Sequence, residues 1–200
     1  APIIPVSALK RVNIDALLAA IQKYIPTPER DVGGQLMMYV IRSFDVNRPG
    51  TPPDEIVGGV VGGSIVRGVL KVGDEIEIRP GIPVKQGAKT VYEPIVTEVT
   101  SLRFGKHEAK EAKPGGLVAV GTKLDPALTK ADNLVGNVVG RPGSMPDVFN
   151  ELTITYELFS TVVGMKESIK VEPISKGEPL LLAVGPALTM GDVAGVKKDS

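Results

Sequence analysis

The segment Gly68-Val69-Leu70-Lys71-Val72-Gly73-Asp74-Glu75-Ile76-Glu77-Ile78 indicates two strands joined by a tight turn. From Glu75 to Ile78, charged residues alternate with isoleucines, and the side chains of a strand alternate between its two faces. A period of two therefore indicates a strand with one side in a core and the other in water. We expect Ile76 and Ile78 to point inward and Glu75 and Glu77 to face solvent.

The central part of the chain repeats this pattern of short apolar runs between turn residues. Glycine (23) and proline (17) together make up a fifth of the 200 residues, which favours β-sandwiches or barrels. Strand candidates are Gln35 to Phe44, Gly59 to Val66, Glu75 to Arg79, Ile95 to Arg103, Leu117 to Thr122 and Leu134 to Val139. Six strands within about a hundred residues predict a closed barrel.

Only one stretch has helical periodicity. Its apolar residues recur every three or four positions and share one face: Ile14, Leu17, Leu18, Ile21 and Ile25. We expect a helix over residues 13–25, with the Asn13 side chain capping its start and Lys23 near its negative end. Pro26 and Pro28 end it, and Pro26 to Asp31 indicates a linker.

A second proline and glycine cluster, Arg141 to Pro146, precedes the alternating run Leu152 to Leu158. Further strand candidates are Ser168 to Val171, Leu180 to Val184 and Thr189 to Val196. So few strands cannot close a barrel, and exposed edges call for a covering partner. We therefore expect an incomplete second barrel over residues 144–200, after a complete one over 29–143 and a separate segment over 1–28.

Composition excludes several classes of function. Lysine plus arginine (23) equals aspartate plus glutamate (23), so the chain has no overall field to attract DNA. No cysteine and a single histidine exclude disulfides and zinc cages, which fits a cytoplasmic protein without a metal. Four Phe, four Tyr and no Trp disfavour a general single-strand binder. No apolar run approaches the roughly 20 residues that span a membrane.

Several segments, in this order and spacing, resemble domain II of the gamma subunits of archaeal and eukaryotic translation initiation factor 2, which are translational GTPases. The segments are Ile41 to Gly50, Gly58 to Ser64, Gly68 to Gly81, Lys113 to Pro126 and Val138 to Gly140. The first and fourth distinguish this family from elongation factors. The resemblance covers nearly the whole chain.

The resemblance implies an all-β protein: a translation-factor-type barrel (domain II), a truncated second barrel (domain III) and one preceding helix from the end of a GTPase domain. Ser7, Ala8 and Leu9 resemble the element that lies against the guanine base. The parent protein would bind GTP and magnesium and deliver methionyl initiator tRNA to the small ribosomal subunit. It would act as part of a heterotrimer with alpha and beta subunits.

This fragment itself is expected to have no catalytic residue and no cofactor. Gly58 to Ser64 has the glycine spacing of a phosphate-binding loop, but Ser64 stands where the lysine is required. Asp31 to Gly34 mimics a switch motif, yet it follows the helix and linker rather than a nucleotide-binding strand. Hydrolysis of GTP needs a phosphate loop, a lysine and magnesium ligands together.

The expected binding residues form two groups. The first would receive the acceptor end of the tRNA: Arg42, Gly62, Gly63, Lys113, Gly115 and Gly116. Glycines expose backbone N–H groups to ribose or phosphate, although they also mark bulges and barrel corners, and scattered cations are often only solvated. The second would hold the alpha subunit: Asn47, Arg48, Pro49, Asp54 and Glu55. Val84 to Tyr92 is a second expected partner loop.

Two alternatives remain open on sequence. One is the corresponding part of another translational GTPase, such as the selenocysteine-specific elongation factor, although the loop Asp45 to Glu55 is longer than an elongation-factor turn. The other is a hydrolase with paired carboxylates, either Asp54 with Glu55 or Glu75 with Glu77. His107 lies in the charged run 106–111, where we expect an exposed loop and no catalytic role.

Overall fold

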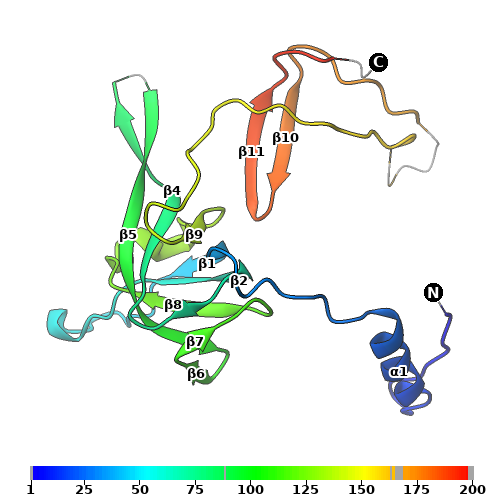
Figure 1. Ribbon diagram of the computed structural model, residues 1–200, viewed down its shortest axis with the longest axis horizontal. Coiled ribbons are helices and arrows are strands. Elements are labelled where there is room, and N and C mark those ends of the chain that lie inside the picture. The colour runs from blue at the N-terminus through cyan, green and yellow to red at the C-terminus, as the bar shows by residue number, and fades with distance from the viewer. Residues whose placement is uncertain (1, 88, 163, 165–168, 198–200) are drawn as a thin grey trace. The chain divides into compact units, whose positions relative to one another are not determined.

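The computed structural model describes residues 2–87, 89–162, 164 and 169–197. The chain divides into two compact units, Ala1–Arg30 and Asp31–Ser200. The first contains one helix, and in the second most of the regular secondary structure is β-strand (Figure 1). The expected all-β class with a single leading helix is confirmed. No helix in the described part of the chain is long and apolar enough to cross a membrane.

The leading helix α1 (Ile14–Tyr24) forms where the apolar periodicity predicts it. The predicted side-chain cap is wrong, because Asn13 adopts a left-handed conformation (φ 57°) and makes no capping hydrogen bond. Its amide Nδ2 instead donates to the Pro5 carbonyl at 2.9 Å, across a turn in which Ser7 pairs with Val12. The N-terminal segment thus competes successfully for the side chain that would have capped the helix.

Six strands close the predicted barrel. Around the ring they are β4 (Glu75–Gln86), β9 (Val138–Gly140), β1 (Met37–Phe44), β2 (Val60–Arg67), β8 (Val118–Thr122) and β5 (Lys89–Phe104). Direct pairing of β4 with β5 completes the circle. The short β9 lies between β1 and β4, so Met38, Val139 and Ile78 form one continuous row through the core. All three side chains are fully buried, as is Ile76, which confirms the predicted inward face of β4.

Short strands and helical turns lie outside the ring of six strands. β6 (His107–Ala109) pairs with β5, and β3 (Leu70–Lys71) pairs with β7 (Glu111–Ala112). The helical pieces are η1 (Pro53–Glu55), α2 (Pro126–Thr129) and η2 (Lys130–Asp132). The loop expected at 106–111 is therefore wrong in part, since most of it pairs as strand. His107 itself is exposed, as expected.

Two strand expectations differ in length from the structure. β4 and β5 run on into a long hairpin that projects from the barrel (Figure 1), with Val84 facing Val91 in register. The loop expected over Val84 to Tyr92 is therefore wrong for 84–86 and 89–92, which are paired strand, while residue 88 lies outside the described residues. Conversely, β9 begins only at Val138, because Leu134 lies in a turn in which the Asn137 amide donates to the Leu134 carbonyl at 3.1 Å.

Glu77 departs from the expected solvent-facing pattern, since its side chain is only 6% exposed. The segment after β9, Arg141 to Asp147 and here termed the linker segment, covers it. Glu77 accepts a hydrogen bond from the Gly143 N–H at 3.0 Å and is paired with Arg79. Arg79 in turn donates to the Pro146 carbonyl at 2.8 Å. The linker segment is thus tied to the outer face of β4.

In the described C-terminal residues, β10 (Pro179–Val184) and β11 (Ala187–Asp192) form a hairpin. The strand expected over Leu180 to Val184 is confirmed, whereas the one expected over Thr189 to Val196 begins earlier and ends at Asp192. The strand expected over Leu152 to Leu158 is not formed, and its apolar side chains are exposed. Lys170 makes a single bridge to Thr161, while Ser168 lies outside the described residues. Alternating sequence produces a strand only where a neighbour accepts its backbone hydrogen bonds, and none is present for this stretch among the residues described.

Acid should weaken the barrel through Asp74. Burial opposes ionisation of this carboxyl, but hydrogen bonds from Arg141 and from the Lys71 N–H outweigh it, so its pKa is lowered. A lowered folded-state pKa adds stability above the unfolded pKa of about 3.9, and this is lost as pH falls through the folded value. We expect Asp74→Asn to destabilise the chain at pH 7 and to reduce the drop in unfolding free energy below about pH 4. Urea unfolding at pH 7 and pH 3 measures both, with the exposed Asp54→Asn as control.

Candidate nucleic-acid interface

Across four neighbouring strands, one row of residues has an arginine at each end. Arg42 of β1 faces Gly62 of β2, Gly62 faces Ala119 of β8, and Ala119 faces Arg103 of β5. We call these four residues the arginine row. One strand neighbour of each row residue, namely Ser43, Val61, Val120 or Leu102, is buried, so the row itself points outward.

The row forms a shallow surface with cationic ends. The side chains of Arg42 and Arg103 are 67% and 55% exposed, whereas Gly62 and Ala119 between them offer almost no side chain. Strand backbone is therefore accessible between two guanidinium groups, which bind phosphate and stack on planar rings. Such a surface can hold a ribose or base flat against the strands. It offers no nucleophile or general base.

A glycine turn lies beside the row. Gly115 and Gly116 have φ values of 125° and 74°, a conformation that residues with a side chain rarely adopt. The Ser64 hydroxyl donates to the Gly116 carbonyl at 3.2 Å, which fixes the turn against β2. The structure thus brings Gly62, Gly63 and the Gly115–Gly116 turn to one end of the barrel.

Gly62 and Gly63 serve different structural purposes. A Cβ on Gly63 would come much closer than 3.0 Å to the Tyr39 carbonyl oxygen, a distance that real Cβ atoms essentially never show. Tyr39 lies next to a β-bulge in β1 between Val40 and Arg42. A Cβ on Gly62 would meet nothing nearer than the Arg42 Cβ at 3.6 Å. The fold itself therefore requires Gly63, whereas Gly62 leaves open space on the outer surface.

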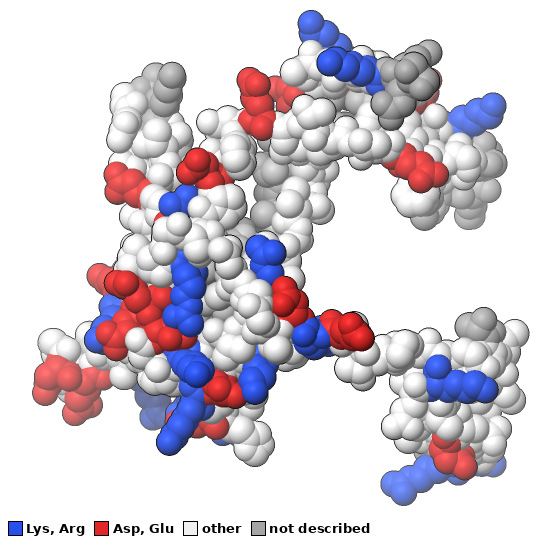
Figure 2. All heavy atoms as spheres, viewed as in Figure 1, with Lys and Arg blue, Asp and Glu red and all other residues white. Residues whose placement is uncertain are grey.

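The cations near the row all have acidic neighbours. Arg42 Nε lies 3.0 Å from Asp132 Oδ1, and Arg103 is paired with Glu108. Lys113 Nζ lies 2.8 Å from Glu111 and lowers the pKa of that carboxyl. On the face that Figure 2 shows, basic and acidic side chains are likewise interspersed over the barrel. Attraction of a polyanion here must come from local contacts rather than from a broad positive field.

Asp132 is the most firmly held of these acids. Its Oδ1 accepts a hydrogen bond from the Ser43 N–H at 2.9 Å as well as from Arg42 Nε. The Ser43 N–H, followed by the Arg42 hydrogen bond, lowers the pKa of Asp132, so the carboxylate stays charged at neutral pH.

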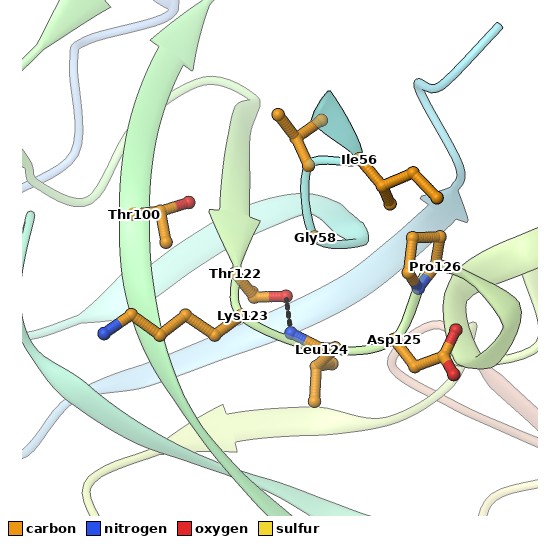
Figure 3. A pocket seen from close by; sticks show the side chains of 9 residues that line it. Ile56, Gly58, Thr100, Thr122, Lys123, Leu124, Asp125 and Pro126 are labelled. Carbon is orange, nitrogen blue, oxygen red and sulfur yellow. Dashed lines mark hydrogen bonds between the residues drawn. The ribbon is translucent and has the colours of Figure 1, made fainter. Parts of the chain in front are cut away.

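A depression with a volume of about 630 Å³ lies at the other end of β8 (Figure 3). Three of its polar side chains already have partners within the chain. The Thr122 hydroxyl contacts Gly59 O and Leu124 N, Asp125 caps α2 through Ala127 N, and Lys123 Nζ lies 2.7 Å from Glu98. No group of three or more acidic, histidine or cysteine side chains that could hold a metal occurs in the described ranges.

Comparison with known proteins matches both parts of the chain. The family model described as "Elongation factor Tu domain 2" matches residues 58–140, and "Initiation factor eIF2 gamma, C terminal" matches residues 150–200. Translation initiation factor 2 subunit gamma from Aeropyrum pernix is 62% identical over 99% of this chain and 48% of its own length. Its namesake from Thermococcus kodakarensis is 60% identical over 100% of this chain and 49% of its own length. This chain belongs to the initiation factor 2 gamma family.

The chain spans about half the length of these curated relatives. Among solved structures, translation elongation factor SelB from Methanococcus maripaludis, in its apo form, has a TM-score of 0.53 and 24% identity, covering 72% of this chain and 28% of that one. That likeness concerns the fold alone. Because the gamma subunits share far more sequence, membership of an elongation-factor family is not favoured.

The hydrolase alternative is not favoured either. Glu77 is buried against Arg79 and Gly143 rather than paired with Glu75, and Asp54 and Glu55 are exposed in η1, within the loop between β1 and β2. In that loop Asn47 is structural: its side chain contacts both backbone groups of Val57, at 2.8 and 2.9 Å, and closes the loop. Arg48, Pro49, Asp54 and Glu55 are exposed.

Sequence reasoning selected Arg42, Gly62, Gly63, Gly115, Gly116 and Lys113, but it missed Arg103, Ala119 and Asp132. Arg103 is the last residue of a predicted strand, and its local sequence does not single it out. Its place opposite Ala119 depends on the register between β5 and β8. Asp132 ends η2, and nothing local in the sequence marks it. In the first compact unit, Ser7, Ala8 and Leu9 lie in a turn where Ser7 Oγ accepts from Lys10 N at 3.3 Å.

Proposed function

We propose that this chain supplies the barrel domains of an initiation factor 2 gamma subunit and that the arginine row receives the acceptor end of methionyl initiator tRNA. The observation that carries the proposal is the placement of Arg42 and Arg103 at the two ends of Gly62 and Ala119 on adjacent strands. Phosphates or the terminal ribose would contact the guanidinium groups, and the small residues would admit the terminal base. Lys113 and the Gly115–Gly116 turn would border this surface.

The domain limits belong to the same proposal. Residues 1–28 would be the tail of a GTP-binding domain, 29–143 domain II, and 144–200 an incomplete domain III. GTP and magnesium would bind elsewhere in the parent subunit, since residues 1–200 contain no phosphate-loop sequence with its lysine. Ser7, Ala8 and Leu9 would lie near the guanine base there.

The partners follow from the family. The parent would join alpha and beta subunits and carry initiator tRNA to the small ribosomal subunit in the cytoplasm. The exposed loop tip, with Arg48, Pro49, Asp54 and Glu55, would meet the alpha subunit, and Asn47 would hold the loop in shape. A loop closed by its own side chain loses little freedom on binding, which favours its use as a docking surface.

A binding titration tests the arginine row. We expect Arg42→Ala and Arg103→Ala, each in the intact gamma subunit, to weaken methionyl initiator tRNA binding by about tenfold, or about 1.4 kcal/mol. Each variant should also lower the slope of log affinity against log salt by roughly one, because one phosphate contact is lost.

Lys85→Ala is the matched control, since it removes an exposed cation from the projecting hairpin, away from the row. It should leave both affinity and slope unchanged. If the two arginine variants bind tRNA as the control does, the docking surface is elsewhere.

A further inference from the structure

The turn that carries Asp132 has an unusual backbone. Ala131 and Asp132 are consecutive non-glycine residues with φ values of 55° and 60°. Residues with a side chain avoid this left-handed region, and they persist in it only where surrounding contacts enforce it. Contacts of residues 129–134 with β1 therefore hold this backbone in place.

Three hydrogen bonds fasten this turn to the end of β1. Thr129 Oγ1 donates to the Phe44 carbonyl at 3.1 Å, and Ser43 N–H donates to Asp132 Oδ1 at 2.9 Å. The buried Ser43 Oγ accepts from Leu134 N–H at 3.0 Å. Because Ser43 holds both Asp132 and Leu134, the carboxylate is fixed relative to the strand that bears Arg42.

Asp132 uses the same oxygen to hold Arg42. The contact is made through Nε, at 3.0 Å, and is the only hydrogen bond of this guanidinium to the described part of the chain. A guanidinium has five donors, so this contact leaves the two terminal nitrogens available to a ligand. An arginine anchored in this way loses less side-chain freedom when it binds phosphate.

We propose that Asp132 is a positioning residue, which holds Arg42 through Nε and aims its terminal N–H groups at a phosphate or ribose oxygen at the end of the arginine row. This inference rests on the proposed function of that row. It assigns the strained turn a purpose, since the left-handed backbone brings the carboxylate under the arginine. Asp132 itself does not touch the nucleic acid.

Removal of the Asp132 carboxylate should change tRNA affinity in the direction opposite to that expected from net charge alone. Removal of an acidic side chain near a polyanion-binding surface should tighten binding if only charge matters. We expect Asp132→Gly instead to weaken methionyl initiator tRNA binding by about fivefold, in keeping with coupling between groups in contact. Glycine is the suitable replacement because it adopts the left-handed conformation without strain.

The experiment measures tRNA affinity at several salt concentrations for the intact gamma subunit with Asp132→Gly, Asp132→Asn, Arg42→Ala and the Asp132→Gly/Arg42→Ala double substitution. Asn keeps an oxygen that accepts from Ser43 and Arg42 and tolerates the left-handed region, so it should bind within about twofold of wild type. The double substitution should bind no more weakly than Arg42→Ala alone, because Asp132 acts only through Arg42. Thermal melting checks that each variant is folded.

The outcomes are distinguishable. Weak binding by Arg42→Ala together with tighter or unchanged binding by Asp132→Gly overturns the positioning role and leaves the proposed function standing. Wild-type binding by Arg42→Ala overturns both. If Asp132→Gly fails to fold, Asp132→Asn decides: affinity within about twofold of wild type supports positioning, and tighter binding at low salt shows that the carboxylate acts only as a repelling charge.

Discussion

Replacement of Gly63 by alanine is expected to destabilise the barrel by about 3 kcal/mol or more. The added methyl group would collide with the backbone carbonyl of Tyr39 and would lie 3.1 Å from Met38 Cε in the core. A carbonyl within a paired strand cannot move aside as a flexible side chain could. Urea denaturation of the full chain measures the change.

Gly62→Ala is the matched control, one residue away on the same strand. Its methyl group would point outward and meet nothing nearer than 3.6 Å, so we expect a change within about 0.5 kcal/mol. Equal effects of the two substitutions would contradict the close approach of β1 and β2 at the bulge. For the same reason, tests of nucleic-acid docking should use substitutions at Gly62, because Gly63 variants would lose the fold itself.

Truncation of Glu77 to alanine should be comparably harmful, with an expected loss of about 3 kcal/mol. The side chain is the acceptor for Gly143 N–H and the charged partner of Arg79 Nε, so its removal leaves both of these N–H groups without their acceptor beside a largely buried cation. Thermal or urea unfolding would report the loss. Limited proteolysis should also cut the linker segment faster, since Gly143 would be released from β4.

Glu75→Ala provides the comparison, because Glu75 lies on the same strand with its side chain exposed. We expect it to change stability by less than about 0.5 kcal/mol. Glu77→Gln should fall between the two, since its amide oxygen can still accept from Gly143 but carries no charge for Arg79. If the two alanine variants were equally stable and equally resistant to protease, the linker segment would not be bound through Glu77.

Period and turn composition were sufficient to predict the barrel, because both are local properties. The alternation around Ile76 and Ile78 predicted which residues share a face. It could not predict that the face bearing Glu77 is covered. The covering residues, Gly143 and Pro146, lie several strands further along the sequence. Similarly, the alternation from Leu152 to Leu158 could not reveal whether a neighbouring strand is available to pair with it.

The candidate site was predictable only in part for a related reason. Arg42 and Gly62 were selected through segments that resemble a family, and the glycine pairs through their backbone freedom. Arg103 was not, because its alignment with Ala119, Gly62 and finally Arg42 requires the register of three strand pairs. That register includes bulges between Val40 and Arg42 and between Val99 and Ser101, which local composition does not locate.

The position of β9 in the ring has a consequence for synthesis of the protein. β9 contains only three residues, yet it supplies the pairing partner of both β1 and β4. Translation proceeds from the N-terminus, so the other five strands of the ring leave the ribosome before β9 does. Until then, the nascent chain has two open sheet edges, and such edges favour misfolding and association with other chains. Ribosome pausing before β9 has emerged would prolong this vulnerable state, whereas pausing after β9 has emerged would find the ring already able to close.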